Sequence, residues 1–557
     1  MHTNWISQLG DYNPQLFREI KGRLHKRNVL LAVTTSLLTQ LGVFLYFQSL
    51  LPNSDSITYT NYHKYCTGQY LDISRECLFD GFGNVMINWP LWFQDIFTGL
   101  SIIGFFSILV AGTYLLINDL ATEERRDTLN FIRLSPQPPQ SILFGKMLGV
   151  PILIYLGVFL AIPLHLWLGL NANLSLISIF GFYIIVITAS LFYFSGALLF
   201  GLIGSWLGGF QAWLGSGAVL GFLLFTQQSL KDEISFNYPF VILKLINPYY
   251  FIPQSRGLTL DNFNWFVLPL GNNWLTIIGF AVVIHLLGAY FIWESLQRCF
   301  RDRNATMLSK QQSYLLTIAF TIITIGCANW SKVVFGIGNI ASAMTENMAC
   351  LMFLNLWLFL YLIAALTPHR HTLQDWARYR HLASSPTGKR QLMQDLIWGE
   401  KSPAVVAIAL NVIISITGLS LFTLVSTTDI YTKFNIFISL IFAGSLAVIY
   451  AVLAQLLLMM KNGQRLFWTN GILGAVIILP VVALAMLFSY PGNQTFLWLF
   501  SIAAPLIVLY PSSGASAMTA FLAIMGHVGI LGLFLFQMTR QLRRLGESGT
   551  RVLLERN

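Results

Sequence analysis

The sequence predicts an all-α, polytopic helical membrane protein with about 12 transmembrane helices in two six-helix halves. Three observations lead to this class. Hydrophobic residues make up 55% of the 557 residues, and the mean hydropathy is +0.65. Only 10% of the residues are charged, whereas a soluble domain usually carries about 25%. Apolar windows of about 20 residues, the length that crosses the hydrocarbon layer, recur along the whole chain.

The predicted spans divide equally between the two halves of the chain. In the first half they cover residues 28–50, 96–117, 147–170, 176–204, 209–227 and 274–295. In the second half they cover residues 313–338, 347–366, 403–425, 434–459, 466–488 and 516–537. The expected domains are therefore 1–295 for the first half, 296–312 for a cytoplasmic linker, and 313–557 for a second, more divergent half.

One further apolar piece, residues 495–511, is predicted to form a re-entrant hairpin on the outer face. Counting this piece as a full span would place the basic C-terminal tail outside. A hairpin broken at Tyr510–Ser516 keeps that tail inside. Non-helical backbone at membrane depth is tolerated only where it is buried in protein or lines a cavity. The hairpin is therefore expected to face the protein interior.

The basic residues predict the orientation in the membrane. With both termini in the cytoplasm, the inner segments hold most of the 33 Lys and Arg residues. The outer segments and the spans keep only Lys64, Arg75, Lys231, Lys244, Arg256, Lys332 and Lys433. This positive-inside asymmetry explains the net charge of +10 as membrane topology. No basic groove with interleaved aromatic residues is visible, so membrane lipid is an expected partner and nucleic acid is not.

The cysteines do not show the spacing of a metal site. Cys66 and Cys77 both fall in the outer loop 51–95, eleven positions apart. In an oxidising compartment they would be able to form a disulfide, and two unpaired loop thiols are the alternative. The remaining three are Cys299, Cys327 and Cys350.

The segment before the first span, Asn13–Asn28, has the pattern of a helix that lies in the membrane interface. Four apolar residues fall on one helical face, and most of the basic residues fall off it. The apolar residues are Leu16, Phe17, Ile20 and Leu24. The alternative is a basic flank that only orients the first span.

The stretch Asn118–Gly149 is the most hydrophilic passage of the first half, and we call it the elbow. It is predicted to form two short helices joined by a Pro-rich turn. Asp119 or Thr122 is expected to cap the first helix, with Glu123 and Glu124 favourable in its first turn. The alternative is a charged loop that lies among lipid headgroups.

The end of the first elbow helix is predicted at Ser135-Pro136, because the residue before a proline is pushed out of the helical region. A second short helix from Ser141 leads into the third span. A helix bounded by proline transmits a displacement to the spans attached to it, whereas a flexible loop absorbs it. The elbow is therefore expected to be rigid.

Two polar features recur in the second half of the chain. The inner loops contain DTLNFIRLSP (Asp127–Pro136) and HTLQDWARYRHLASSP (His371–Pro386). The outer segments contain LINPYYFIP (Leu245–Pro253) and IVLYPSSGA (Ile507–Ala515), each just before the last span. With six spans in each half, these features indicate a parallel repeat.

The elbow resembles the signature loop of the ABC-2 class of ABC-transporter permeases. The resemblance is carried by Glu124–Leu129 (ERRDTL), by Leu134-Ser135-Pro136 and by Gly145-Lys146. These match a Glu-Arg, a Thr-Leu, a Ser/Thr-Pro and a Gly-Lys of that family. The segment 13–28 also resembles the family's connecting helix.

The resemblance implies that the elbow contains a coupling helix, which docks on a separate cytoplasmic ABC ATPase subunit. The implied coupling residues are Glu123, Glu124, Arg125, Arg126, Asp127, Thr128, Leu129, Ser135 and Pro136. The second half departs from the family's pattern, because Thr372 lies fourteen residues before Pro386 and no Glu-Arg pair precedes it. The residues of a second coupling loop there would be Thr372, Leu373, Asp375, Arg378 and Pro386.

The function implied by the resemblance is that of a permease subunit of an ABC transporter, an exporter in a bacterial plasma membrane. Its substrate would be apolar or amphipathic, and the chain would not be an enzyme. ATP and Mg²⁺ would bind the partner, because this chain lacks a P-loop. The nearest runs, Phe144–Met147 (FGKM) and Thr387–Arg390 (TGKR), lack the first glycine and the hydroxyl residue. No cofactor or metal is expected on the chain itself.

Two other classes of function stay open at this stage. An ion-gradient-driven transporter or lipid flippase would need ionisable residues in the spans. These are few: His165, His285, His527 and Lys332, with Asp95 and Glu294 near span ends. A membrane enzyme would need a polar cluster, for which His369, His371 and Asp375 are the candidates as metal ligands.

Overall fold

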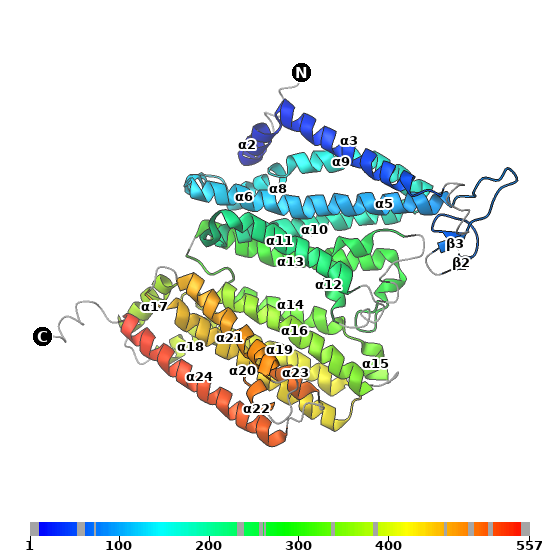
Figure 1. Cartoon of the computed structure of the whole chain (residues 1–557). Helices are drawn as coiled ribbons and strands as arrows, with labels where there is room; N and C mark the ends of the chain where they lie inside the picture. The colour runs from blue at the N-terminus through cyan, green and yellow to red at the C-terminus, as the bar shows by residue number, and fades with distance from the viewer. Residues whose placement is uncertain are drawn as a thin grey trace. The chain divides into compact units, whose positions relative to one another are not determined.

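The computed structural model of the chain is almost entirely helical (Figure 1). It describes residues 10–52, 62–71, 74–230, 239–254, 260, 263–302, 304–335, 340–382, 388–461, 465–487, 495–510 and 516–546. Within these residues, 11 helices are long and apolar enough to cross a membrane. The chain is therefore a polytopic all-α membrane protein, as its composition predicts.

The chain divides into two compact units. The first unit comprises Met1–Glu233, Leu243–Phe263 and Pro269–Arg301, and the second comprises Ile234–Ile242, Asn264–Leu268 and Asp302–Asn557. The last long helix of the first unit continues to Arg301, and the next helix begins at Lys310. Both ends of the predicted linker, residues 296–301 and 310–312, thus belong to long helices.

The first unit contains the elbow and the predicted spans of the first half. Its helices are α2 (Pro14–Arg23), α3 (Lys26–Ser49), α5 (Trp89–Phe106), η1 (Ser107–Ala111), α6 (Gly112–Arg125), α7 (Thr128–Arg133), α8 (Pro139–Gly149), α9 (Ile152–Asn171), α10 (Leu176–Ile203), η2 (Ser205–Phe210), α11 (Gln211–Ser229), η4 (Pro248–Phe251), η5 (Leu270–Asn272) and α13 (Trp274–Arg301). Helix α12 (Val241–Ile246) lies where the units divide. The long helices pack in pairs: α3 on α9, α6 on α10 and α11, and α10 on α13.

The second predicted span is part of a much longer rod. Helices α5, η1 and α6 form one continuous run, Trp89–Arg125, of 37 residues. At about 1.5 Å per residue such a rod is about 55 Å long, whereas the hydrocarbon layer is about 30 Å thick. The rod therefore extends well past the membrane, and its C-terminal end forms the first part of the elbow.

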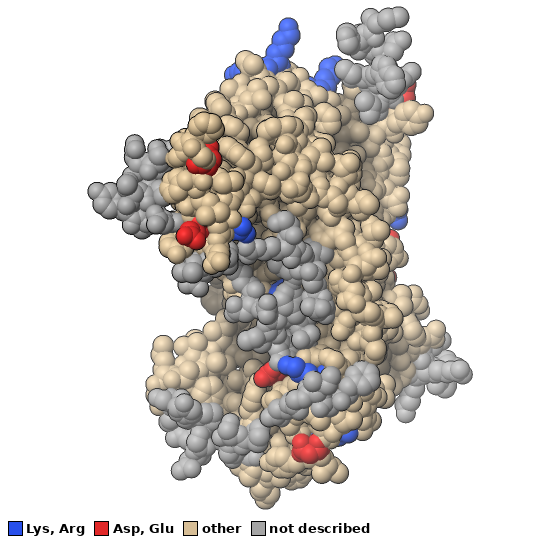
Figure 2. All heavy atoms as spheres, turned by 90° about the vertical axis from the view of Figure 1, so that its right-hand side faces the viewer, with Lys and Arg blue, Asp and Glu red and all other residues tan. Residues whose placement is uncertain are grey.

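The loop between α3 and α5 is held by short strands and one disulfide. Strands β1 (Tyr62–His63), β3 (Ser74–Glu76) and β2 (Tyr70–Leu71) form a small antiparallel sheet in the order β1-β3-β2. Cys66 and Cys77 are bonded to each other, and both are buried. Seen from the side on which β2 and β3 lie in Figure 1, the described surface is mostly uncharged (Figure 2).

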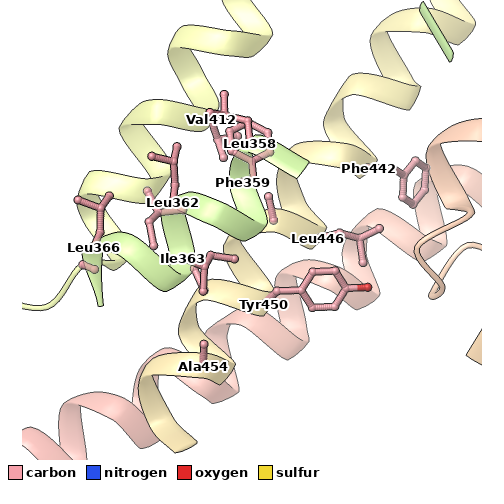
Figure 3. Close-up of a cluster of buried hydrophobic side chains, with 14 of the residues drawn as sticks. Leu358, Phe359, Leu362, Ile363, Leu366, Val412, Phe442, Leu446, Tyr450 and Ala454 are labelled. Atoms are coloured by element: carbon pink, nitrogen blue, oxygen red, sulfur yellow. The ribbon is translucent and has the colours of Figure 1, made fainter. Parts of the chain in front are cut away.

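The second unit contains α14 (Lys310–Gly326), α15 (Trp330–Phe335), α16 (Ile340–Leu366), α17 (Arg370–Leu382), α18 (Gly388–Trp398), α19 (Val405–Val425), α20 (Ile430–Leu458), α21 (Arg465–Leu487), α22 (Thr495–Trp498), α23 (Ala504–Leu509) and α24 (Ala517–Gly546). The predicted span 313–338 is broken, because α14 ends at Gly326 and a separate short helix follows. The core is formed by α16, α19 and α20, whose buried side chains include Leu362, Val412 and Tyr450 (Figure 3).

The apolar piece near residue 500 does not form a span. Helices α22 and α23 have four and six residues, far fewer than the about 20 that cross a membrane. Leu499, Ala504 and Leu509 are buried, and the Ser439 hydroxyl of α20 donates a hydrogen bond to the Pro505 carbonyl. One side of the piece is thus packed against protein, whereas Phe496, Leu497 and Leu506 are exposed. Its break lies between α22 and α23, and most of the predicted break at Tyr510–Ser516 lies outside the described residues.

The two units share one packing plan. The pairs α3·α9, α6·α10 and α10·α13 of the first unit correspond to α14·α19, α16·α20 and α20·α24 of the second. A histidine in the last long helix of each unit lies against a carbonyl of the short helical segment that precedes that helix. His285 Nε2 lies 3.3 Å from Ile246 O, and His527 Nε2 lies 3.1 Å from Leu499 O.

Candidate functional site

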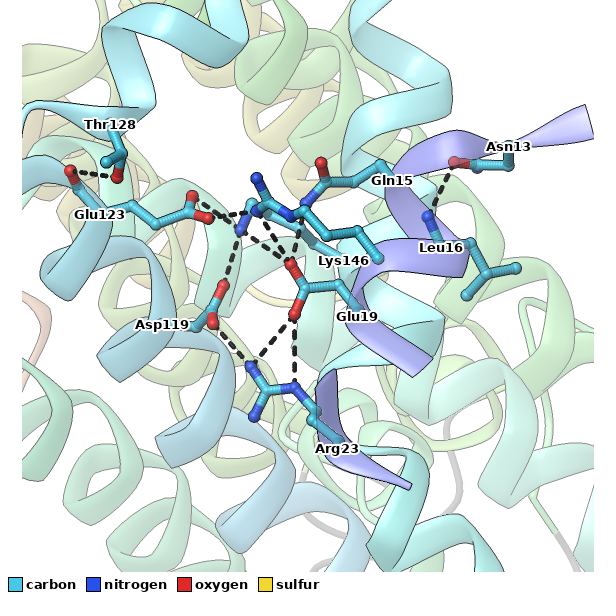
Figure 4. Close-up of polar contacts among 10 residues, drawn as sticks. Asn13, Gln15, Leu16, Glu19, Arg23, Asp119, Glu123, Thr128 and Lys146 are labelled. Carbon is cyan, nitrogen blue, oxygen red and sulfur yellow. Dashed lines mark hydrogen bonds and ion pairs between the residues drawn. The ribbon is translucent and has the colours of Figure 1, made fainter. Parts of the chain in front are cut away.

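The elbow of the first unit takes part in a charged junction in which three helices meet (Figure 4). Asp119 and Glu123 stand four residues apart on α6, so their side chains project from the same face of the helix. Lys146 comes from α8 and Glu19 from α2. We define the charged junction as Arg18, Glu19, Arg23, Asp119, Glu123 and Lys146.

Lys146 is the centre of the charged junction. Its side chain is 0% exposed, and Nζ lies 2.6 Å from Asp119 Oδ2 and 2.7 Å from Glu123 Oε2. Glu19 Oε1 is 3.7 Å away. Burial alone lowers the pKa of the Lys146 ammonium, but these carboxylates outweigh burial and hold that pKa above its usual value. Lys146 therefore stays charged while fully enclosed.

Two arginines of α2 close the charged junction from the other side. Arg18 NH2 lies 2.6 Å from Glu123 Oε1, and Arg23 NH2 lies 2.6 Å from Asp119 Oδ1. Both arginines also contact Glu19, at 3.2 and 3.3 Å. Three carboxylates and three cations thus neutralise one another. A buried charge is tolerated only when it is paired and hydrogen-bonded in this way.

Two glycines of α8 allow α2 to approach closely enough for these contacts. A Cβ atom on Gly149 would lie 2.5 Å from Glu19 Cβ, and one on Gly145 would lie 2.8 Å from the Leu16 backbone nitrogen. Asn13 caps α2 by accepting from the Leu16 N–H at 3.0 Å, and it donates to the Ser141 carbonyl at 2.8 Å. Helix α2 is therefore attached to α8 at its N-terminal end and along its middle.

The N-terminal helix differs from its prediction in length and in the face it buries. The predicted segment Asn13–Asn28 forms two helices, because α2 ends at Arg23 and α3 begins at Lys26. The residues of α2 that are buried are polar, Gln15 and Glu19. The predicted apolar face is only half-buried or exposed, which leaves it available to the membrane interface.

The predicted start of the elbow helix is wrong. Asp119 and Thr122 do not cap a helix, because both lie inside α6, which continues from the membrane rod to Arg125. The chain breaks instead at Asp127, which has a left-handed backbone with φ of 55°. Helix α7 then runs from Thr128 to Arg133, and Pro136 follows it.

The elbow contacts α13 as well as α2. The Arg133 guanidinium lies 5.6 Å from the centre of the Phe300 ring. The Phe144 and Trp293 rings are 4.3 Å apart, and Gln140 donates to Gln297 at 3.0 Å. These contacts hold both short helices of the elbow against one long membrane helix.

The structure separates the predicted coupling residues of the elbow into three groups. Glu123 belongs to the charged junction, and Leu129 is buried. Glu124 and Ser135 are half-buried. The remaining ones are exposed: Arg125, Arg126, Asp127, Thr128 and Pro136.

Sequence reasoning missed several residues of this region. Glu19, Asp119 and Lys146 were not assigned to a charged cluster, although Glu19 is the only acidic residue of the basic segment 13–28. Phe131 and Leu134 were not assigned to a surface, yet they are 82% and 85% exposed. Two large apolar residues three positions apart in a hydrophilic loop were the available signal.

The loop of the second unit is built differently. Leu373 is buried in a cluster with Val405, Val452, Leu456, Met459 and Met538, because α17 packs on α24. Thr372 is half-buried, whereas Asp375 and Arg378 are exposed. Pro386 lies outside the described residues.

The acidic residues of the charged junction are also the one described group with metal-like spacing. Ligand atoms of Glu19, Asp119 and Glu123 lie within 4.8 Å of one another. The Lys146 ammonium already lies among these carboxylates, so an ion pair satisfies them. Elsewhere in the described residues, His369, His371 and Asp375 do not bring three ligand atoms together in this way.

No protein-family model, curated protein or solved structure matches the chain.

Proposed function

We propose that the chain is the membrane-spanning permease subunit of an ABC exporter in a bacterial plasma membrane, with both termini in the cytoplasm. ATP hydrolysis in a separate subunit drives it, and ATP and Mg²⁺ bind that subunit. The observation that supports this proposal best is the exposed tip of the elbow. Phe131 and Leu134 are 82% and 85% exposed there, although the elbow is firmly attached to the membrane helices.

The tip has the chemistry of a protein interface. Phe131 and Leu134 stand three residues apart, so they project on the same side of the chain. Arg125, Arg126 and Asp127 are exposed close by in the sequence. Apolar side chains surrounded by charged ones are typical of surfaces that bind another protein. The occupant proposed here is a nucleotide-hydrolysing cytoplasmic subunit.

Motion of that partner would reach the membrane helices through rigid connections. Helix α6 is continuous with the rod Trp89–Arg125, and α8 is followed directly by α9. Leu129 is buried, and the charged junction fixes α2 to both α6 and α8. A displacement of α7 is therefore expected to move α3, α6 and α9 together rather than to be absorbed in a loop.

The test places a photoreactive phenylalanine analogue at Phe131 of the full chain in its native membrane. We expect it to crosslink to a protein that contains a P-loop. The control is the same analogue at Phe82, which is 93% exposed in the outer loop and is not expected to give that adduct. Crosslinks from Phe131 to lipid alone would contradict the proposed docking surface.

The second part of the test measures ATP hydrolysis in proteoliposomes by the partner that crosslinking identifies. We expect the full chain to stimulate it and the double variant Phe131→Asp, Leu134→Asp to abolish that stimulation. Reversal of charge at Glu124 and Arg125 is expected to weaken it. Ion-gradient-driven transport by this chain alone, with no ATPase present, would instead support a gradient-driven transporter.

A further inference from the structure

The first unit contains a partly open cavity of about 530 Å³ lined by α3, α5, η1, α9 and α10. Its lining extends from Asn28 to Gln40 on α3 and from Leu153 to His165 on α9. Either stretch covers a rise of about 18 Å in a helix, which is close to half of the about 30 Å hydrocarbon thickness. The cavity is thus elongated along the membrane normal and has roughly the length of one lipid leaflet.

The wall of the cavity is uncharged. None of the described residues that line it is Asp, Glu, Lys or Arg. Most are apolar, and α3 contributes Thr35, Ser36, Thr39 and Gln40 along one face. On its other face, Leu37, Leu38 and Leu41 are more than half exposed and suit contact with lipid. A charged group inside the cavity would lose its hydration without gaining a counter-charge, so the part of an occupant that lies in the cavity has to be neutral.

One end of the cavity presents an ordered polar group. The Ser101 hydroxyl donates to the Phe97 carbonyl at 2.8 Å and lies 2.7 Å from His165 Nε2. The His165 ring thus links Ser101 to the Tyr183 hydroxyl, which lies 2.8 Å from Nδ1. In either tautomer of His165 the Tyr183 oxygen keeps a free lone pair, and Tyr183 lines the cavity. It is therefore an acceptor for a hydroxyl group of a ligand.

The rod that forms another wall is irregular at this level. Residues Ser107–Ala111 form a π-helix between α5 and α6, and Ser107, Ile108 and Ala111 line the cavity. Single π-helical turns are rare and occur frequently at functional sites. The cavity, the ordered polar group and the π-helix are independent features that coincide in one place.

We propose that this cavity binds one molecule of an uncharged long-chain lipid alcohol. The chain lies along α3 and α9, and the hydroxyl group donates to the Tyr183 oxygen. The volume falls within the range of about 300–1,000 Å³ that is usual for ligand sites. The site lies entirely within the first unit and does not depend on an ATPase partner.

The probe is hexadecanol with a diazirine in its chain, added to the full protein in nanodiscs. We expect saturable photolabelling, mapped by mass spectrometry, on the faces of α3, η1 and α9 that line the cavity. Unlabelled hexadecanol is expected to compete. Labelling spread evenly over the lipid-facing side of α3 around Leu37 and Leu38, without saturation, would overturn the proposal.

A variant that fills the cavity gives the second arm. A Cβ atom on Gly104 would meet open space, and Gly104 lines the cavity. Gly104→Leu is therefore expected to fold and to abolish the saturable labelling. Gly279→Leu is the matched control, because Gly279 on α13 also faces open space but does not line the cavity. Undiminished saturable labelling of Gly104→Leu would exclude the cavity as the site.

The third arm tests the role of the hydroxyl group. Tyr183→Phe removes one acceptor, so half-saturation by hexadecanol is expected to need about fivefold more probe. The methyl ether of the same probe cannot donate a hydrogen bond, so its labelling should not change between the native protein and Tyr183→Phe. An equal loss for both probes would indicate general damage to the helix packing and would contradict hydroxyl recognition.

Discussion

The Lys146 ammonium of α8 lies 2.6 Å from an Asp119 carboxylate oxygen of α6, although the two residues are 27 positions apart in the sequence. Lys146 stands at the start of the third membrane segment and Asp119 at the end of the second. Because the lysine is fully buried, this contact cannot be exchanged for water without separating the helices. The contact therefore holds the two sides of the elbow together as one rigid unit.

Replacing Lys146 tests how much the charged junction stabilises the protein. Lys146→Met leaves three carboxylates without their central cation, and losing one partner of a buried ion pair costs about 3–5 kcal/mol. We expect a lower unfolding temperature in nanodiscs and faster proteolysis between α2 and α3. Lys21→Met is the control, because Lys21 is exposed on α2. Adding Glu123→Gln to Lys146→Met should restore part of the loss, and equal unfolding temperatures in all variants would disprove the role of the charged junction.

The pH dependence of this contact follows from the raised pKa of Lys146. A lysine whose pKa is higher in the folded protein contributes its full stabilisation below the unfolded value of about 10.4. That stabilisation is lost as the pH rises through the folded-state pKa. The difference in stability between the native chain and Lys146→Met is therefore expected to stay constant from about pH 6 to about pH 9 and to shrink above about pH 10.5. Denaturant unfolding of both proteins across this range measures it, and a difference that shrinks already near neutral pH would count against the assignment.

The close approach of α2 and α8 predicts an unusual sign for a glycine substitution. Gly→Ala inside an exposed helix usually stabilises by up to about 1 kcal/mol. At Gly149 a Cβ atom would lie 2.5 Å from Glu19 Cβ, so Gly149→Ala is expected to destabilise by about 1–3 kcal/mol through overpacking. Gly196→Ala on α10 is the control, because its Cβ would meet nothing within 4 Å. Thermal unfolding should move in opposite directions for the two variants, and a shared direction would argue against tight packing at Gly149.

His527 is predicted to stabilise the segment 495–510 of the second unit. Since a carbonyl only accepts, Nε2 donates to Leu499 O at 3.1 Å, and Nδ1 accepts from the Ser445 hydroxyl at 2.8 Å. His527→Leu leaves a buried carbonyl unpaired, which costs about 1–3 kcal/mol. We expect faster hydrogen exchange in residues 495–510 and partial recovery in His527→Gln. Unchanged exchange there would show that packing against α20 is sufficient.

Much of the fold could be predicted because each span is a local property of the sequence. A continuous apolar stretch of sufficient length has to form a helix in lipid, whatever its neighbours are. The predicted spans therefore correspond to long helices with one clear exception, the stretch 313–338, in which α14 ends at Gly326. That the piece near residue 500 does not form a span was predicted from charge, since another span there would have placed the basic tail outside.

The charged junction could not be predicted in the same way, because its partners are far apart in sequence. Glu19 and Asp119 have ordinary neighbours in the chain, and nothing local indicates that both approach Lys146. Their meeting depends on the angle at which α2 crosses α8, and that angle depends on two glycines. The predicted helix cap at Asp119 was wrong for the same reason. A carboxylate that can cap a helix can also form a buried ion pair, and the neighbouring residues do not distinguish the two.

By itself, the sequence determined the membrane class, the positions of most spans, the expected orientation and a hydrophilic elbow between the second and third spans. These depend on hydrophobicity and charge summed over neighbouring residues. Only the tertiary structure decided where the elbow breaks, which of its charges are buried, that Phe131 and Leu134 are exposed, and that a cavity lies beside Tyr183. Those features depend on contacts between helices, whose free energies depend on distances of a few ångströms that no single segment specifies.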